Sequence, residues 1–247
     1  MTYPKYKNKH LEEALFNAHD SGTVLKHKNM KLPKKYIFLY HHSVKNYLKR
    51  KYKPKKIVLS PIMIIYVWKD IGFVDMKGIG SPYAAGAIEN LIALGGKKFL
   101  NVGVAGGLHS WGFYLCTKAL RDEGTSYHYL PHGKYVYPDK ILTNNFGKTM
   151  DKAGISYLRA PTWTTDAFYR ETKAEIVHYS KIGIKTVEME AAALFSIAQV
   201  RKVKIASAFV VSDILGEKWE NKFGKWDLHH ALNQLFDAAV ECLKEVK

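Results

Sequence analysis

The sequence predicts an α/β fold in which a central sheet is flanked by helices. Short apolar runs rich in β-branched and aromatic residues alternate along the chain with stretches whose apolar residues recur at helical spacing. The 247 residues contain no tandem repeat, low-complexity tract or Gly/Ser linker, and 47% of them are hydrophobic, enough for one sizeable core. We therefore expect a single domain over residues 1–247, with residues 1–30 as a basic N-terminal extension.

Strands are expected where a short apolar run is bounded by polar, Gly or Pro residues. In chain order these runs are residues 36–40, 56–60, 62–68, 98–104, 113–119, 155–160 and 204–212. Helices are expected over residues 81–94, 190–202 and 227–246, with another over Leu11–His19. The first of the three has Ser81 as its expected cap, Pro82 in its first turn and Gly95–Gly96 as its stop.

The composition excludes several classes of protein. The longest apolar stretch, residues 57–68, is too short and too interrupted to span a bilayer, and the N-terminal residues lack the apolar run of a secretory signal. Cys116 and Cys242 lie far apart and show no metal-ligand spacing, so we expect free thiols in a reducing compartment. These observations predict a cytoplasmic protein with no membrane partner.

The positive charge is concentrated near the N-terminus. Of a total of +16, residues 1–56 contribute +12, from 15 Lys and Arg against three Asp and Glu. Such a segment could bind nucleic acid or attract anionic substrates. Because its lysines form no recognisable nucleic-acid motif, we interpret it as a solvated surface and expect no nucleic-acid partner.

The segment TVEMEAAALF (186–195) places two acids at the start of a small-residue helix. Glu188 and Glu190 flank Met189, and three alanines follow. A segment that serves only to pack has no evident need of two carboxylates, because an unpaired buried charge is costly. We therefore expect a functional role for this segment.

Two glycine-rich segments could bring a ligand against bare backbone. NVGVAGGL (101–108) ends a buried strand, and KGIGSP (77–82) precedes a helix start, where backbone N–H groups favour an anion. Simple tight turns explain both patterns as well, and the sequence leaves this alternative open.

An aromatic segment and an isolated acid are further candidates for a binding site. WTTDAFYRET (163–172) places Trp163 and Phe168 beside polar groups such as Arg170, a composition that suits a planar heterocycle but also a loop that plugs the core. Asp213 follows the last apolar run, where residues line the ligand crevice of α/β sheets. An Asp that caps the next helix would occupy the same position.

A metal site is not expected. The pairs His41–His42 and His229–His230 could supply ligands, but adjacent side chains point in different directions and no third ligand is evident. The sequence also shows no nucleophile elbow, P-loop or zinc signature.

Taken in order, these segments resemble the nucleoside phosphorylase superfamily, which contains purine nucleoside phosphorylases, uridine phosphorylases and methylthioadenosine/S-adenosylhomocysteine nucleosidases. The resemblance rests on GIGSPYAAGAIENLIALGGKKFLNVGVAGGL, RDEGTSYHYLP, TTDAFYRET, TVEMEAAALF and VVSD, and it is faint before residue 77. The string EMEAAALF is the most specific of these. The resemblance implies a three-layer α/β/α fold around a mixed, partly barrel-like sheet.

By this resemblance the two acids hold the sugar of a nucleoside whose N-glycosidic bond is broken. Glu190 would bind the ribose 2′- and 3′-hydroxyls, Met189 would pack beneath the sugar, and Glu188 would support the same hydroxyls or the base edge. A carboxylate accepts charge-assisted hydrogen bonds and stabilises positive charge that develops on the sugar. A thioether gives soft contact without competing for the hydroxyls.

The resemblance also implies a site for the base. Asp213 would be the acid that faces purine N7, because protonation there turns a poor leaving group into a neutral base. Phe168 would stack on the base. Its other expected contacts are Trp163, Arg170, Ala105 and Gly106. Asp213 favours a purine, whereas RDEGTSYHYLP and FYRET are more similar to uridine phosphorylases, so uridine is the alternative.

The expected phosphate site departs from the family pattern. Asn101 and Val104 stand where phosphorylases carry Arg and Ser or Thr, and a GDP-x-R-type loop is missing. The residues expected to bind phosphate are Gly80, Lys45, Val104 and Arg121, with His42 as an alternative to Lys45. NVGVAGGL is similar to the pattern of the water-using nucleosidases. Their N-terminal catalytic glutamate has no counterpart, because Glu12 and Glu13 lie in an expected surface helix.

These inferences predict a pentosyltransferase, a nucleoside phosphorylase that releases free base and ribose 1-phosphate. A nucleosidase that uses water and a non-catalytic nucleoside-binding protein are the alternatives. Phosphate is the expected co-substrate, and no cofactor is expected because an acid, a sugar clamp and a nucleophile suffice. Since family members associate as dimers to hexamers, we expect a homo-oligomer in which a neighbour completes the site, with His10 or His19 of the basic segment in that part.

Overall fold

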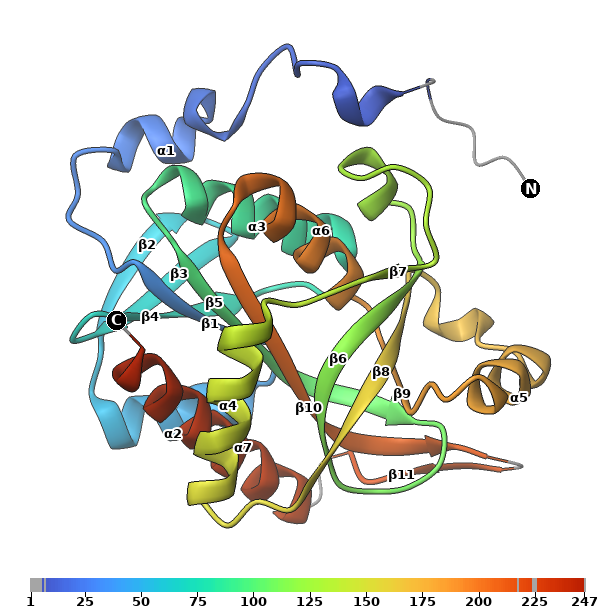
Figure 1. Ribbon diagram of the computed structural model, residues 1–247. Coiled ribbons are helices and arrows are strands. Elements are labelled where there is room, and N and C mark those ends of the chain that lie inside the picture. The colour runs from blue at the N-terminus through green and yellow to red at the C-terminus, as the bar shows by residue number, and fades with distance from the viewer. Residues whose placement is uncertain (1–5, 7, 217, 224–225, 247) are drawn as a thin grey trace.

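The computed structural model describes residues 6, 8–216, 218–223 and 226–246 (Figure 1). Residues 1–5 and 7 of the expected N-terminal extension lie outside this description. Within it, eleven strands form one mixed sheet, and helices cover both of its faces. The predicted three-layer α/β/α class with a partly barrel-like sheet is therefore confirmed.

The barrel-like part of the sheet is a closed ring of strands. β5 (Lys98–Gly107) pairs in parallel with β10 (Lys204–Leu215), which pairs antiparallel with β6 (Phe113–Asp122). β6 pairs in parallel with β8 (Tyr157–Thr165), β8 pairs in parallel with β9 (Thr186–Glu188), and β9 returns antiparallel to β5. Closure removes the exposed strand edges that an open sheet would have at these positions.

The open part of the sheet starts from the first half of β5. Residues 98–102 pair with β1, and the order continues through β4 and β3 to β2. These strands are β1 (Lys35–Leu39), β4 (Ile71–Met76), β3 (Met63–Trp68) and β2 (Lys55–Ser60). At its other end, β5 pairs with β9 through Gly106 and Gly107. β5 therefore belongs to both parts of the sheet.

Helices pack on both faces of the sheet (Figure 1). One face carries α3 (Ser81–Ala93) and α6 (Ala191–Arg201), and the other carries α2 (His42–Tyr52), α4 (Lys140–Lys152) and α7 (Trp226–Glu245). The strands serve both layers because their side chains alternate between the two faces. In β1, Tyr36 and Phe38 join the core under α3 and α6, whereas Ile37 and Leu39 join the other core.

Four smaller elements complete the fold. α1 (Gly22–His27) contacts α3 and β2, and α5 (Lys173–Lys181) packs beside the barrel through Tyr179. The short strands β7 (Tyr135–Val136) and β11 (Trp219–Asn221) pair with β6 and β10. In the described part of the chain, no helix has the length and hydrophobicity needed to traverse a bilayer.

α6 is a buried helix rather than an amphipathic one. Residues 191–198 are all buried, and the alanines among them allow α3 and α6 to pack closely. The N-terminus of α6 therefore lies inside the protein. Its first backbone N–H groups cannot bond to water there, so they need partners from the protein.

All seven expected strands and the three expected long helices are present, with ends that differ by a few residues. The expected cap of α3 is wrong by one position. Gly80, with φ of 96°, is the N-cap residue, and Ser81 is the first residue of the helix. A φ in this left-handed region favours glycine, which explains why the cap is not the serine.

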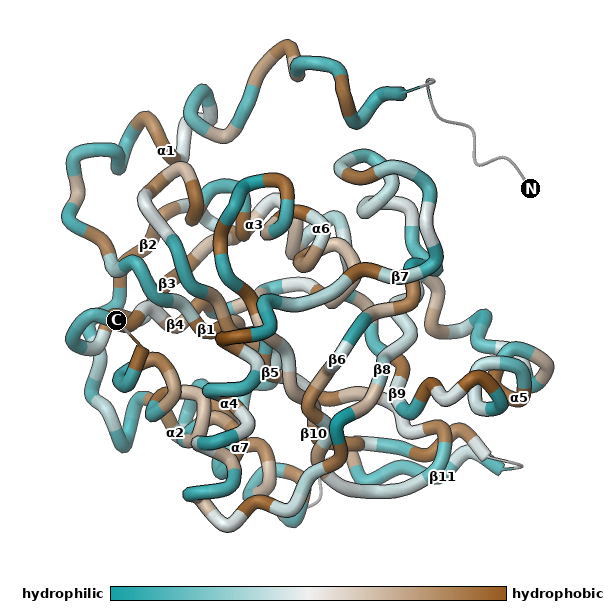
Figure 2. The backbone as a smooth tube through the Cα atoms, in the orientation of Figure 1, coloured by the Kyte–Doolittle hydropathy of each residue, from teal (hydrophilic) through white to brown (hydrophobic). Residues whose placement is uncertain are grey.

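The expected helix over Leu11–His19 is wrong. Residues Lys9–Leu11 and Ala18–Asp20 form single 3₁₀ turns, and the second is fixed by a capping box between Asn17 and Asp20. Leu15 is 100% exposed, so no buried face holds a helix together here. Figure 2 shows this segment along the outside of the molecule, with apolar stretches among polar ones.

Gly72→Ala is expected to lower the free energy of unfolding by about 1–3 kcal/mol, because the new Cβ would overlap the fully buried ring of Tyr36. Gly86→Ala is the matched control. Gly86 lies in α3 with open space around its Cβ position, so alanine there should be neutral or stabilise by up to about 1 kcal/mol. Urea unfolding of both variants measures the difference, and equal stabilities would contradict the prediction.

Candidate active site

A cavity of about 660 Å³ lies at the end of β5. Its wall includes residues 103–106 of β5, residues 187–190 between β9 and α6, and Ser212 and Asp213 of β10. Cavities of this size bind small organic ligands. The expected site residues that line it are Val104, Ala105, Gly106, Phe168, Glu188, Met189, Glu190 and Asp213.

The Glu188 carboxylate caps the buried N-terminus of α6. Its Oε2 accepts the N–H groups of Glu190 at 2.8 Å and Ala191 at 2.7 Å, and its Oε1 accepts the hydroxyl of Thr164 at 2.5 Å. The Thr164 oxygen in turn accepts the N–H of Ala192 at 3.0 Å. These bonds satisfy the first N–H groups of the helix and hold Glu188 in one position.

Glu190 joins the start of α6 to the start of α3. The N–H of Gly80 donates to Glu190 Oε1 at 2.5 Å, and the Ser81 hydroxyl donates to the carbonyl of Met189 at 2.7 Å. The starts of α3 and α6 therefore hold residues 188–190, the acidic segment that was expected to be functional, in a fixed position. The Met189 and Glu190 side chains are presented to the cavity by these two helix starts rather than by a mobile loop.

Glu188 and Glu190 form a buried acidic pair, with only 6% and 8% of each residue exposed. Burial raises the pKa of both carboxyls above their ordinary value, and the charge of Glu190 raises the pKa of Glu188 further. The hydrogen bonds from Thr164 and from the backbone oppose this shift. The pair therefore gains a proton at a higher pH than exposed glutamates do.

The glycines of β5 are required by close packing against β9 and β10. A Cβ on Gly106 would lie 2.6 Å from Leu215 Cδ1 and 3.0 Å from Val187 Cγ1, and a Cβ on Gly107 would lie 2.8 Å from Ile214 Cδ1. The two glycines lie within the strand and pair with β9 and β10, so neither is a simple turn residue. At Gly106, the missing side chain also leaves room beside Asp213.

Asp213 lies where β10 is irregular. The pairing of β10 with β5 shifts register between Val211 and Asp213, and Ser212 occupies the bulge. The Ser212 hydroxyl donates to Asp213 Oδ1 at 2.7 Å, and Trp219 Nε1 donates to Oδ2 at 2.8 Å. Bulges re-aim side chains next to sites, and here two donors fix the carboxylate at the cavity wall.

Four aromatic side chains line the mouth of the cavity. Phe168 and Tyr169 contact each other with ring centroids 4.1 Å apart, and Trp219 and Phe223 lie 6.2 Å apart. All four are exposed, from 44% for Phe168 to 89% for Tyr169. Large exposed aromatic faces around a cavity are typical of a site that binds a planar group.

Two charged wall residues, Glu171 and Lys173, were not predicted. Both lie just after the aromatic turn at Phe168–Arg170, and both line the cavity. Burial raises the pKa of Glu171 to about 7, and the charges of Asp213 and Glu175 add to the shift. The signal in the sequence was the acid that ends the aromatic segment FYRE, and it was overlooked in favour of its neighbour Arg170.

Two polar groups in the wall have no bonding partner. The Tyr40 hydroxyl and Asn101 Oδ1 are buried, and no described residue forms a hydrogen bond with either atom. Buried polar atoms are nearly always paired in native proteins. The described residues therefore leave the hydrogen-bonding capacity of both atoms unused.

Two residues expected to contact the base lie outside the wall. Trp163 is buried in the core between the barrel and α5, where its Nε1 donates to Asp122 Oδ2 at 2.9 Å and its ring packs on Tyr179. Arg170 lies on the surface in the turn before Glu171. The size of Trp163 fits it for the core, which explains why its side chain does not reach the cavity.

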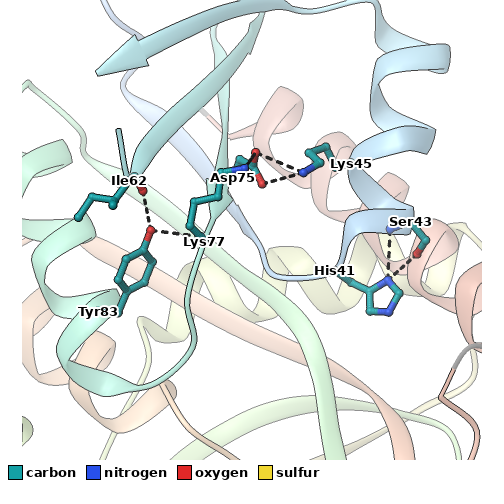
Figure 3. A network of polar contacts seen from close by, with 7 residues as sticks. All are labelled: His41, Ser43, Lys45, Ile62, Asp75, Lys77 and Tyr83. Carbon is teal, nitrogen blue, oxygen red and sulfur yellow. Dashed lines mark hydrogen bonds and ion pairs between the residues drawn. The ribbon is translucent and has the colours of Figure 1, made fainter. Parts of the chain in front are cut away.

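Lys45 of the expected phosphate site also lies outside the cavity wall. Its Nζ is 3.4 Å from the carboxylate of Asp75, which also pairs with Lys77 at 2.6 Å (Figure 3). In the same view, His41 faces Ser43 at the start of α2, with their side chains 2.7 Å apart. The role of Lys45 toward phosphate stays a prediction.

Arg121 and Gly80 have other partners in the structure. The buried guanidinium of Arg121 donates to the hydroxyl of Ser126 at 2.9 Å and to the carbonyl of Pro131 at 2.8 Å. The Gly80 N–H donates to Glu190. The Gly80 N–H is therefore engaged and the Arg121 guanidinium is held by protein acceptors, and their assignment to phosphate stays a prediction.

The histidine pairs are brought partly together. The rings of His41, His42 and His229 lie with centroids 4.9 to 6.4 Å apart. Burial lowers the pKa of His41, and the other two histidines lower it further. Among the residues described here, no group of three His, Cys, Asp or Glu side chains has an arrangement that could hold a metal ion.

Comparison with known proteins gives a consistent picture. The family described as the phosphorylase superfamily matches residues 40–244. A uridine phosphorylase from Treponema pallidum is 29% identical over 183 residues, which cover 68% of this chain and 70% of that protein. A guanosine phosphorylase from Halorubrum lacusprofundi is 30% identical over 139 residues, which cover 54% of this chain and 57% of that protein.

A similar solved structure is that of an AMP nucleosidase from Bacteroides thetaiotaomicron. It superposes with a TM-score of 0.71 over 87% of this chain and 91% of that chain, at 21% sequence identity. At this identity the likeness concerns the fold. The same fold therefore occurs in proteins that are named for different reactions.

Glu190→Gln is expected to lose less stability than the wild type as the pH rises from 5 to 8. The pKa of Glu190 is higher in the folded than in the unfolded chain, so its favourable contribution at low pH is lost as the pH rises through the folded-state value. Gln keeps an acceptor for Gly80 but cannot ionise, which should reduce the loss by about 1–3 kcal/mol. Urea unfolding at several pH values between 5 and 8 measures the free energy of unfolding of each protein. Exposed Glu220→Gln is the control, and identical pH slopes in all three proteins would refute the prediction.

Proposed function

Because the chain belongs to the phosphorylase superfamily, we propose that it cleaves the N-glycosidic bond of a purine nucleoside with phosphate, releasing free base and ribose 1-phosphate. The observation that supports this most is that Met189, Glu190 and Asp213 line one cavity of about 660 Å³. These residue types supply what the reaction needs at the sugar and at the leaving base.

At the sugar, Glu190 accepts hydrogen bonds from two ribose hydroxyls. Its Oε1 already accepts the N–H of Gly80, which leaves Oε2 for the ligand and fixes the carboxylate beforehand. A fixed negative group stabilises the positive charge that develops on the sugar without reorganising. Glu188 acts as a positioning residue, because its oxygens are engaged by Thr164 and by the start of α6.

At the base, Asp213 faces the ring nitrogen that gains a proton as the bond breaks. The bonds from Ser212 and Trp219 orient its carboxylate. Phe168 stacks on the base from the mouth of the cavity, and the bare backbone at Gly106 allows the flat ring to approach β5.

Phosphate is the favoured acceptor because both curated relatives described above are named phosphorylases. Among the described residues that line the cavity, Lys173 is the cation that would contact phosphate. Val104 and Asn101 also line the wall.

Hydrolysis is the second candidate, and the charge of the wall favours it. Four carboxylates line the cavity against the single described cation, Lys173; they belong to Glu171, Glu188, Glu190 and Asp213. A wall of this kind repels a phosphate dianion but can orient and deprotonate a water molecule.

Product chromatography after incubation with inosine, guanosine, adenosine and uridine, each with and without phosphate, tests the reaction. We expect base release from at least one purine nucleoside, only with phosphate, and formation of ribose 1-phosphate. Release that ignores phosphate would move the assignment to the nucleosidase. If nucleosides bind but no product forms, the remaining assignment would be a non-catalytic nucleoside-binding protein.

Glu190→Ala is expected to lower kcat/KM for the accepted nucleoside by about 10²- to 10³-fold, because a preorganised group that stabilises the transition state is lost. Exposed Glu12→Ala is the control and should retain wild-type activity. Steady-state kinetics of both variants measure the effect. Full turnover by the Glu190 variant would overturn its proposed role at the sugar.

A further inference from the structure

Six lysines gather at one edge of the sheet, at the opposite end of β5 from the cavity. They stand at or just before the starts of three neighbouring strands, β1, β5 and β10. We call this surface the lysine edge, and its members are Lys34, Lys35, Lys97, Lys98, Lys202 and Lys204. Four of these residues are exposed, whereas Lys35 and Lys98 are half-buried.

Strand pairing places three of the lysines in one row. Lys35 of β1 and Lys204 of β10 are both in register with Lys98 of β5, and the strands run parallel. Residues in register point to the same face of a sheet, and neighbouring strands lie about 4.8 Å apart, so the row spans about 10 Å. Backbone hydrogen bonds place Lys97 and Lys34 beside it, because the Lys97 N–H donates to the Lys34 carbonyl at 2.8 Å.

Little negative charge balances this surface. Lys35 pairs with Asp70 at 2.8 Å, but the other five lysines form no ion pair with any residue that the structure describes. Six lysines against one aspartate leave a net charge of +5. Burial lowers the pKa of Lys98, and the charges of Lys35 and Lys204 lower it further. The cations of the lysine edge therefore repel one another, and a polyanion would relieve that repulsion.

We propose that the lysine edge binds the phosphate backbone of a nucleic acid. One strand of a duplex carries a phosphate about every 3.4 Å of its axis, so a row of about 10 Å faces about three phosphates. Lysines are flexible point charges, which suits contacts that position a nucleic acid without reading its sequence. The proposal replaces the expectation of no nucleic-acid partner. That expectation considered the lysines in chain order, whereas the sheet builds this row from three distant segments.

The surface fits a nucleic acid better than a membrane. Lasting attachment to a bilayer takes apolar burial in addition to attraction between charges. Residues 34–35, 97–98 and 202–204 include no large exposed hydrophobic side chain, since Val203 is buried. The lysine edge therefore offers charge alone, which is sufficient for binding to phosphates.

The lysine edge and the cavity lie at opposite ends of β5. Lys98 begins the strand and Val104 lines the cavity. Six residues of strand separate them, a distance of about 20 Å. A nucleic acid on the lysine edge therefore leaves the mouth of the cavity open, and this inference does not depend on the proposed reaction.

The test measures the fluorescence anisotropy of a fluorescein-labelled DNA duplex of about 20 base pairs, titrated with protein at salt concentrations from about 50 to 200 mM. The variant combines Lys97→Gln, Lys98→Gln and Lys204→Gln, which removes three lysines of the edge. We expect it to raise Kd by about 10- to 100-fold at the lowest salt concentration. The slope of log K against log salt concentration should become shallower by about 3, because each lost phosphate contact contributes about 0.9.

The matched control removes the same charge elsewhere. Lys140→Gln, Lys148→Gln and Lys181→Gln replace three exposed lysines of α4 and α5, and this variant should bind the duplex within about threefold of the wild type. Urea unfolding of both variants checks that they are folded. Replacing exposed or half-buried lysines should cost little stability.

Three results would overturn the proposal. Equal weakening in both triple variants would mean that affinity follows the total charge rather than the lysine edge. A wild-type protein that does not bind the duplex at the lowest salt concentration would exclude a nucleic-acid surface. Binding to vesicles of phosphatidylcholine and phosphatidylserine in equal amounts, without binding to the duplex, would assign the lysine edge to a membrane instead.

Discussion

The structure depends on satisfying the N-terminus of a helix that begins inside the protein. α6 is buried along residues 191–198, so its first N–H groups cannot be hydrated. The carboxylate of Glu188 and the hydroxyl of Thr164 accept them, and in doing so they tie β8, β9 and α6 together. Glu190 extends the same network to the start of α3. A carboxylate is well suited to this position because the helix dipole favours negative charge at its N-terminus.

This constraint also explains the position of the cavity. The segment 187–190 runs along the end of β5, and β5 can approach Val187 closely because Gly106 carries no side chain. The open sheet and the barrel share β5, so the cavity lies where the strand passes from one into the other. The wall on this side is made of strand and helix starts, whereas the exposed aromatic residues come from the turn Phe168–Arg170 and from β11 and the residues after it.

Much of this arrangement follows from sequence patterns that reflect local physics. Long apolar runs in β5 and β10, and the small-residue helix after Glu190, predict the sheet, its flanking layers and the importance of the acidic segment. β4 was not predicted because Gly72 and Asp75 are unfavourable in strands, and burial of the strand in the sheet overrides that preference. The N-terminal residues Leu11–His19 have helical spacing but no surface to pack on, and spacing alone does not hold a helix.

The individual site residues were harder to predict, for reasons of geometry. Trp163 and Phe168 belong to one aromatic segment, yet the strand directs the first into the core and the turn brings the second to the cavity. Arg121 has the chemistry of an anion ligand, but its guanidinium is buried and bonded to Ser126 and Pro131. Which donors remain free depends on contacts between distant segments, and a single sequence does not contain that information.

The contrast between the two sides of the cavity has a consequence for how such a protein can change. Glu188 and Glu190 are buried and serve the helix starts, so most substitutions there would damage folding as well as any chemistry in the cavity. Tyr169 and Trp219 are exposed at the mouth, where replacements cost little stability. Residues at the mouth can therefore change over evolutionary time at little cost to folding, while the wall formed by Glu188 and Glu190 is kept by the requirements of folding itself.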